Sequence, residues 1–160
     1  MGLHSSVQKV QKALNERGLD VEIIEFSKST RTAAEAAEAI GTSVAQIAKS
    51  LIFLAGDEPI LVITSGANRV DTDKLKAITG REIRQAGADT VRDATGYPIG
   101  GVPPVGHRQR LTTYLDEDFL KFETIYAAGG TPNAIFPISS RKLIEITGGK
   151  VINLKEESGG

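Results

Sequence analysis

Apolar residues recur along the chain with two different spacings, one typical of helices and one of strands. Leu3, Val7, Val10 and Leu14 follow helical spacing, and Gly18 supplies a residue suited to ending that helix. Further helices are predicted wherever a capping residue precedes an apolar run. These start signals are Thr32, Ser43, Asp71, Asp89, Asp116 and Ser139.

Runs rich in β-branched and other apolar residues predict the strands. They cover residues 21–26, 51–54, 60–64, 82–85, 111–115, 124–127, 134–138 and 151–154. The turn sequence at 56–59 joins the second and third runs, so we expect them to pair as a hairpin. Short helices alternate irregularly with these strands, without long βαβ spacers. The pattern predicts one α/β domain over residues 1–157, a mixed sheet wrapped by helices, and a flexible tail at 158–160.

One lysine interrupts the apolar stretch 44–54, at the point where a helix starting at Ser43 is expected to pass into a strand. Lys49 at a helix C-terminus would interact with the helix dipole and reach toward water. Projecting instead into a cleft, its ammonium would neutralise a phosphate or a developing oxyanion. The pattern alone leaves both interpretations open.

The segment 96–106 holds four glycines and three prolines in eleven residues, a density that excludes regular structure. Such a stretch is either an irregular connection or a functional loop. The Gly100-Gly101 pair would let backbone N–H groups approach a ligand oxygen, as an oxyanion hole requires. Gly129-Gly130, just before Thr131, repeats the theme between two predicted strands.

Composition excludes several kinds of site. The 160 residues include no cysteine and two histidines, so we expect no disulfide, thiolate metal site or cysteine nucleophile, and no metal or cofactor. Nineteen basic and twenty acidic residues argue against a general nucleic-acid coat protein and give no reason to expect a DNA partner. A mildly basic middle region is either ordinary surface or a rim that holds a phosphodiester backbone; it comprises Arg81, Arg84, Arg108 and Arg110.

No segment is long and apolar enough to suggest a membrane partner. The runs 51–55 and 60–63 are far shorter than the roughly 20 residues that span a bilayer. Residues 1–30 lack the apolar centre of a signal peptide. We therefore expect a cytoplasmic protein.

Four sequence blocks, at 48–53, 65–71, 94–106 and 128–134, resemble the YbaK/ProX family of trans-editing aminoacyl-tRNA deacylases. That family is similar to the editing domain inserted in bacterial prolyl-tRNA synthetase. The resemblance implies a mixed, mostly antiparallel, barrel-like sheet flanked by short helices. It also implies hydrolysis of the ester between a wrong amino acid and the terminal ribose of tRNA. The implied partners are the 3′ acceptor end of aminoacyl-tRNA and a synthetase such as prolyl-tRNA synthetase, and no cofactor is implied.

The resemblance also assigns residues. Lys49 corresponds to the family's essential lysine and is the expected catalytic residue. The expected substrate-binding residues are Thr32, Ser50, Ser65, Gly66, Asn68, Gly100, Gly101, Val102, Pro103, Gly129, Gly130, Thr131 and Asn133. Many relatives carry histidine where this chain has Asn133, which cannot titrate near neutral pH. A pocket roofed by glycine and valine would admit small amino acids and exclude larger ones.

Two other functions are compatible with the same residues. A non-catalytic module that binds a tRNA end or a synthetase would retain its partner with the ester intact. A hydrolase of another small acyl ester would turn over its substrate regardless of the tRNA body. Retention of both the lysine and the Gly/Pro segment favours the deacylase.

Overall fold

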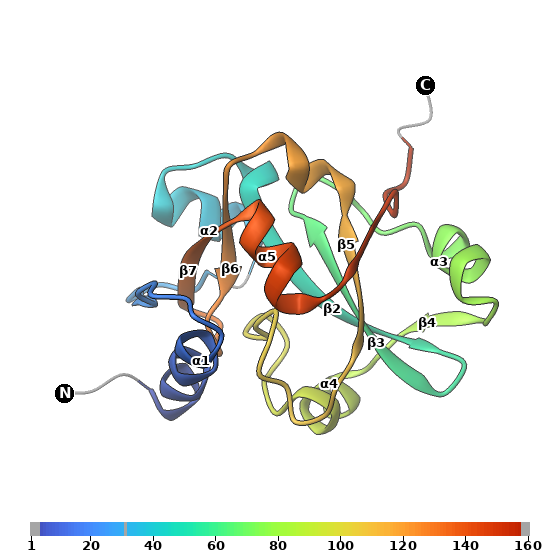
Figure 1. Ribbon diagram of the computed structural model, residues 1–160, viewed down its shortest axis with the longest axis horizontal. Helices are drawn as coiled ribbons and strands as arrows, with labels where there is room; N and C mark the ends of the chain where they lie inside the picture. Colours follow the sequence, from blue (N-terminus) through green and yellow to red (C-terminus); the bar gives the residue numbers. More distant parts are fainter. Residues whose placement is uncertain (1–3, 31, 158–160) are drawn as a thin grey trace.

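Eight strands form one curved sheet in the computed structural model, which describes residues 4–30 and 32–157 (Figure 1). They are β1 (Ile24–Glu25), β2 (Ile47–Ala55), β3 (Glu58–Ser65), β4 (Ile83–Gln85), β5 (Thr112–Asp116), β6 (Thr124–Ala128), β7 (Ala134–Ser139) and β8 (Lys150–Ile152). The order is β1-β7-β6-β2-β3-β5-β8, with β4 paired to β2. Four of the seven strand pairs are antiparallel, which confirms the predicted mixed sheet.

Five α-helices and two short 3₁₀ helices flank this sheet in the described residues. They are α1 (Ser5–Glu16), α2 (Ala33–Ile40), α3 (Thr72–Thr79), α4 (Ala88–Thr95), α5 (Ser140–Thr147), η1 (Val44–Gln46) and η2 (Glu117–Lys121). In Figure 1, α1 and α4 lie below the sheet and α3 lies to the right of it. The predicted capping box is present at α2, where Thr32 and Glu35 bond to each other's backbone amides.

Three sequence expectations need correction. The helix expected from Ser43 ends after one 3₁₀ turn, and β2 begins at Ile47, because residues 48–55 pair with β3 along their whole length. Lys49 therefore lies within a strand, and the interpretation as a cation at a helix C-terminus is wrong. The strand expected over 21–26 shrinks to the two residues that pair with β7. The helix expected from Asp89 begins at Ala88 after the N-cap Gly87.

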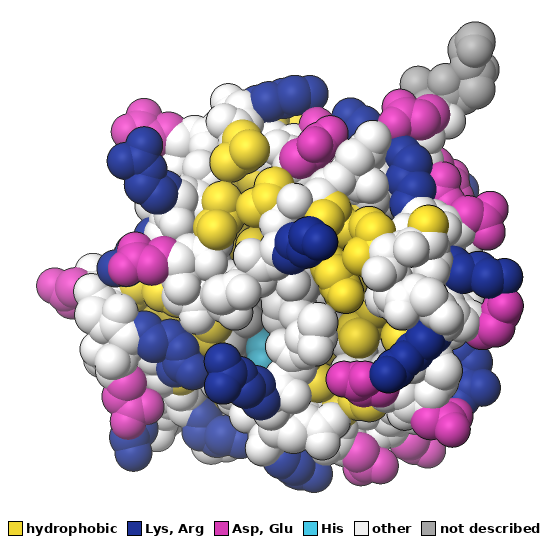
Figure 2. Space-filling view, turned by 45° about the vertical axis from the view of Figure 1, so that its right-hand side comes forward, with side chains coloured by type: hydrophobic (Ala, Val, Ile, Leu, Met, Phe, Trp, Pro, Cys, Tyr) yellow, Lys and Arg dark blue, Asp and Glu magenta, His cyan; other side chains and the backbone are white. Residues whose placement is uncertain are grey.

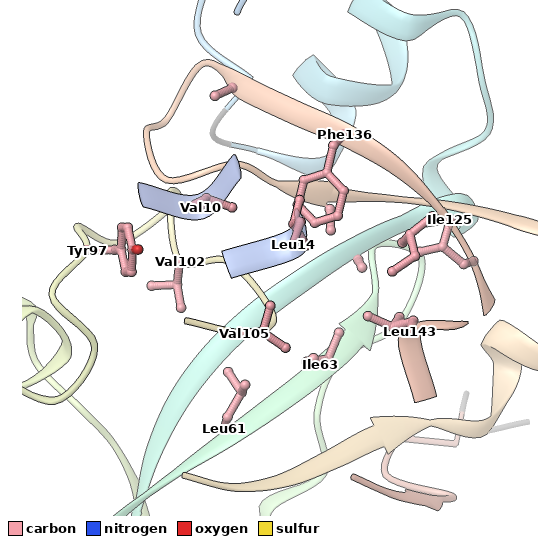
Figure 3. Close-up of a cluster of buried hydrophobic side chains, with 14 of the residues drawn as sticks. Val10, Leu14, Leu61, Ile63, Tyr97, Val102, Val105, Ile125, Phe136 and Leu143 are labelled. Atoms are coloured by element: carbon pink, nitrogen blue, oxygen red, sulfur yellow. The ribbon is translucent and has the colours of Figure 1, made fainter. Parts of the chain in front are cut away.

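Two predicted features lie outside the described residues: Leu3 and the tail at 158–160. The main core fills the concave side of the sheet (Figure 3). Leu14 of α1, Phe136 of β7 and Leu143 of α5 are fully buried in it. The Gly/Pro segment contributes Tyr97, Val102 and Val105 to the same core. That segment is therefore irregular in backbone but anchored by buried side chains, which gives it a fixed position.

Candidate functional site

One edge of β2 is left unpaired in the middle of the strand. On that edge β6 pairs only with Ile47 and Ala48, and β4 pairs only with residues 53–55. The opposite edge is paired with β3 from Ala48 to Ala55. Residues 49–52 thus border a gap in an otherwise continuous sheet.

The strand register determines which backbone groups face this gap. Gly66 N–H donates to the Ile47 carbonyl, so the odd-numbered residues of β2 exchange hydrogen bonds with β3. The even-numbered residues point the other way, as the bond from Ala86 N–H to the Ile52 carbonyl shows. Ser50 is the even-numbered residue inside the gap. Its backbone N–H and C=O are therefore directed toward whatever occupies the gap.

A pocket of about 250 Å³ lies along this open edge. It is bounded by α2 on one side and by α4 with the Gly/Pro segment on the other. Its lining is mostly apolar and consists of Thr30, Thr32, Ala33, Ala36, residues 47–52, Gln85, Ala86, Val91, Ile99, Gly100, Val102, residues 126–128 and Ile135. Five predicted site residues meet here: Thr32, Lys49, Ser50, Gly100 and Val102.

Lys49 carries the one charged side chain of this lining. No hydrogen bond or ion pair engages its ammonium within residues 4–30 and 32–157. Seven other Lys and Arg side chains do form ion pairs with carboxylates. An unpaired ammonium against an apolar wall is suited to stabilising negative charge on a ligand.

The Ser50 side chain adds a second unusual feature. Its Oγ is buried and has no hydrogen-bond partner in the described part of the chain. A buried hydroxyl without a partner costs roughly 1–3 kcal/mol, so such groups are rare unless a ligand satisfies them. Ser50 lines the pocket, and its Oγ is enclosed in the pocket wall with less than 1 Å² of accessible area.

The two glycines of the Gly/Pro segment have different environments. Gly101 N–H donates to the Pro98 carbonyl at 2.9 Å, which closes a turn with Gly100 at φ +88°. The turn requires positive φ at that position, which glycine adopts without strain. Gly100 lines the pocket, and its N–H is unbonded among the described residues. Gly100 can therefore donate to a ligand, whereas the Gly101 amide is already used.

The second glycine pair is closely packed within the protein. A β-carbon on Gly129 would lie 2.6 Å from Ile23 Cγ2, and one on Gly130 would lie 2.8 Å from the Ser6 carbonyl oxygen. Gly129 N–H donates to the Ala134 carbonyl. Gly130, Thr131 and Asn133 instead border a separate, open hollow that His4, Ser6, Glu25 and Pro98 complete.

Asn133 is fully engaged within the protein. Its Nδ2 donates to the Phe26 carbonyl at 2.6 Å, and its Oδ1 accepts from Thr131 Oγ1 at 2.9 Å. It fixes the 129–133 loop to the chain before α2. Pro103 is likewise buried outside the pocket, and its carbonyl lies 2.6 Å from His107 Nε2.

The predicted residues Ser65, Gly66 and Asn68 do not line the pocket either. Asn68 Nδ2 donates to both Asp116 and Asp118, and Asp116 also accepts from Ser65 N–H. The hydrogen bond from Asn68 and then that from Lys155 lower the pKa of Asp118 to about 2. Gly66 supports the pocket from outside, because a β-carbon there would lie 2.5 Å from Ala33 Cβ. The hydrogen bonds of Ser65 and Asn68 to Asp116 connect the end of β3 to the end of β5.

Sequence reasoning missed most of the apolar wall, including Ala33, Ala36, Ala86, Val91 and Ile135. The alanine-rich sequence of α2 was the available signal, because small side chains let a helix approach a sheet closely. In the described residues, no group of three His, Cys, Asp or Glu side chains is placed to hold a metal ion. No helix there is long and apolar enough to cross a membrane.

Comparison with known protein families shows which family this chain belongs to. The family model described as the aminoacyl-tRNA editing domain matches residues 27–146, which includes the whole pocket lining. The chain belongs to the aminoacyl-tRNA editing domain family. It is an editing enzyme that acts on aminoacyl-tRNA.

Three relatives support this assignment. A crystal structure of a candidate trans-editing enzyme for prolyl-tRNA synthetase is 46% identical, with a TM-score of 0.93 over 98% of this chain and 100% of that one. The uncharacterized protein YwhH of Bacillus subtilis is 33% identical over 91% of this chain and 94% of its own length. The proline–tRNA ligase of Ligilactobacillus salivarius is 31% identical over 69% of this chain but only 19% of the ligase. The editing domain thus occurs both alone and within a synthetase.

Proposed function

We propose that this editing domain hydrolyses, in trans, the ester of a tRNA that carries a small wrong amino acid, with Lys49 as the catalytic residue. The aminoacyl group would occupy the pocket along β2. The observation that carries the proposal is the unpaired Lys49 ammonium in a small apolar pocket whose walls also hold the free Gly100 N–H.

The size of the pocket supports a small amino acid. Its volume of about 250 Å³ is below the ≈ 300–1,000 Å³ typical of pockets for larger ligands. The candidate substrates are tRNA-Pro bearing alanine or cysteine, because the relatives of this chain include a candidate trans-editing enzyme for prolyl-tRNA synthetase and a proline–tRNA ligase. Prolyl-tRNA synthetase or another synthetase would be a transient partner. The enzyme would act in the cytoplasm, where tRNA is charged.

The pocket favours a mechanism without a protein general base. No His, Asp or Glu belongs to its lining. An aminoacyl ester is activated, so positioning and stabilisation of the oxyanion provide most of the needed rate enhancement. Lys49 Nζ and Gly100 N–H would stabilise the negative charge that develops on the carbonyl oxygen. Attack would come from water, with a ribose hydroxyl or a substrate side chain as possible assistants.

Ser50 would hold the α-amino group of the substrate. Its backbone carbonyl is an acceptor directed into the gap that the pocket follows. No carboxylate is available in the lining to pair with an ammonium, and Lys49 repels one. The bound substrate would therefore carry a neutral α-amine, whose ordinary pKa of about 7.7–8.0 makes this form accessible near neutral pH.

A deacylation assay tests the proposal. Wild-type protein is incubated with tRNA-Pro carrying alanine, cysteine or proline, and the fraction of intact ester is followed. We expect hydrolysis of the alanyl or cysteinyl ester and slow hydrolysis of the prolyl ester. Lys49→Ala should reduce kcat/KM by about 10²–10³-fold, the loss typical of removing one oxyanion donor. Lys150→Ala, at the exposed first residue of β8, is the matched control.

Two results would overturn the proposal. Failure to hydrolyse any aminoacyl-tRNA would disprove the activity. Equal rates for wild type and Lys49→Ala, with the same thermal midpoint, would disprove the role of the lysine.

A further inference from the structure

Some Lys and Arg side chains of this protein form ion pairs with carboxylates, and others, gathered in one region, do not. Arg81 and Arg84 of the predicted basic rim are paired with Glu58 and Asp57. None of the described ion pairs involves a residue of α1, its C-cap residue Arg17 or the segment 96–110. That region carries five unpaired cationic side chains: Lys9, Lys12, Arg17, Arg108 and Arg110.

We define a basic ridge by three of these side chains, Lys9, Arg17 and Arg108. Lys9 lies on α1, and Arg17 follows the helix as its C-cap residue, where its guanidinium donates to the Ala13 carbonyl at 2.8 Å. Between them Ala13 touches Gly106, where a β-carbon would lie 2.9 Å from Ala13 Cβ. Figure 2 shows several Lys and Arg side chains in the lower left of the view, near a histidine that is visible just left of the centre.

Lys9 and Arg108 lie close to each other over the Gly/Pro segment. Lys9 Nζ is 5.1 Å from the centre of the Tyr97 ring. Lys9 Nζ and Arg108 Nε are each 3.9 Å from the point where a β-carbon on Gly96 would lie, so they are at most twice that distance apart. Arg17 is near enough to His107 to add to the lowering of its pKa, which burial mainly causes. Adjacent like charges without a counter-ion favour an anionic ligand.

The ridge and the pocket share a wall. Tyr97, under Lys9, is fully buried, and Ile99 and Gly100 just beyond it line the pocket. The Gly/Pro segment therefore connects the ridge to the pocket. In an aminoacyl-tRNA whose aminoacyl group occupies the pocket, the nearest phosphates belong to the terminal adenosine and the nucleotides that precede it.

We propose that Lys9, Arg17 and Arg108 bind the phosphates of the nucleotides next to the terminal adenosine of the bound aminoacyl-tRNA. This inference rests on the proposed function, because the pocket must hold the aminoacyl group for the ridge to meet those phosphates. Phosphate contacts fix the register of a nucleic acid without reading its sequence. The ridge gives a nearly neutral protein a local site for RNA.

The test compares two charge-reversal double variants, Lys9→Glu/Arg108→Glu and Arg141→Glu/Lys150→Glu. Both change the net charge equally, and the second pair lies on α5 and β8. The substrates are an alanyl-tRNA and alanyl-adenosine, a nucleoside ester without phosphate. We expect the ridge variant to lose about tenfold or more in kcat/KM on the tRNA and to lose nothing on the nucleoside ester, while the log–log salt slope of tRNA binding falls by about 2.

Several outcomes would overturn the inference. Equal losses in both double variants on the tRNA would show a general charge effect. An equal loss of the ridge variant on both substrates would show an indirect effect on the pocket. Wild-type protein that hydrolyses neither substrate would disprove the proposed function. In that case the affinity of wild type and of the ridge variant for uncharged tRNA is measured instead. Equal affinities would disprove phosphate binding by the ridge.

Discussion

Gly101 lies against the backbone of Thr131, so closely that a β-carbon on Gly101 would be 2.9 Å from the N, Cα and C atoms of Thr131. The two glycine-containing loops, expected to approach a substrate together, instead approach each other at this point. The contact holds the turn of Gly100 in place at the pocket wall. Gly101 therefore acts in packing, and Gly100 presents the free amide.

Gly101→Ala should destabilise the protein because the added methyl group has no space. Overpacking of this kind costs typically 1–3 kcal/mol. We expect a lower free energy of unfolding in urea and slower deacylation, since the turn at Gly100 must shift. Gly87→Ser is the control, because a β-carbon on Gly87 meets no atom within 4 Å and serine is a favoured N-cap residue. Unchanged stability of Gly101→Ala would contradict the close contact.

Ser50→Ala and Ser65→Ala should have opposite effects. Ser50 Oγ has no partner in the described chain, so its removal should leave stability equal or higher. Ser65 Oγ donates to the Ala45 carbonyl at 2.7 Å, so its removal should cost about 1–2 kcal/mol. For deacylation we expect Ser50→Ala to keep kcat/KM near the wild-type value, because the enclosed Oγ is replaced while the backbone carbonyl that faces the gap is retained. Thermal melts and the editing assay measure both, and a destabilised or inactive Ser50→Ala would refute this assignment.

The stability of the protein should fall at acid pH partly through Asp118. Its pKa is about 2 in the folded protein and 3.8 in the absence of structure, so ionised Asp118 favours folding above the higher value. That contribution is lost as pH falls from about 4 to about 2. Asp118→Asn should flatten this part of the curve of unfolding free energy against pH. Asp57→Asn, in the exposed turn between β2 and β3, should keep the wild-type slope; equal slopes for both variants would refute the role of Asp118.

Asn133 should matter for the position of its loop and not for proton transfer. Asn133→Ala removes the hydrogen bond to the Phe26 carbonyl and should cost about 1 kcal/mol of stability. The dependence of kcat on pH between about 6 and 8 should keep its shape, because asparagine does not titrate there. Asn15→Ala, at an exposed position of α1, serves as a comparison. A changed pH profile in Asn133→Ala would show that this position takes part in proton transfer.

Much of this protein followed from local sequence signals. The capping box at Thr32 and the glycine that ends α2 act within a few residues, so they specify a helix wherever the chain lies. The hairpin of β2 and β3 follows from a short turn between two apolar runs. The lysine and the Gly/Pro segment could also be singled out, because one charge in an apolar run and a cluster of glycine and proline are visible without a structure.

Tertiary structure decided which of the singled-out residues meet. That Ser50 faces a gap depends on where β6 stops pairing with β2 and where β4 starts. That Gly100 is free while Gly101 is packed depends on a loop thirty residues away. Asn68 donates hydrogen bonds to the carboxylates of Asp116 and Asp118 and does not line the pocket. Such outcomes arise from contacts between distant segments, and local propensity carries no information about them because the strand pairing itself brings those segments together.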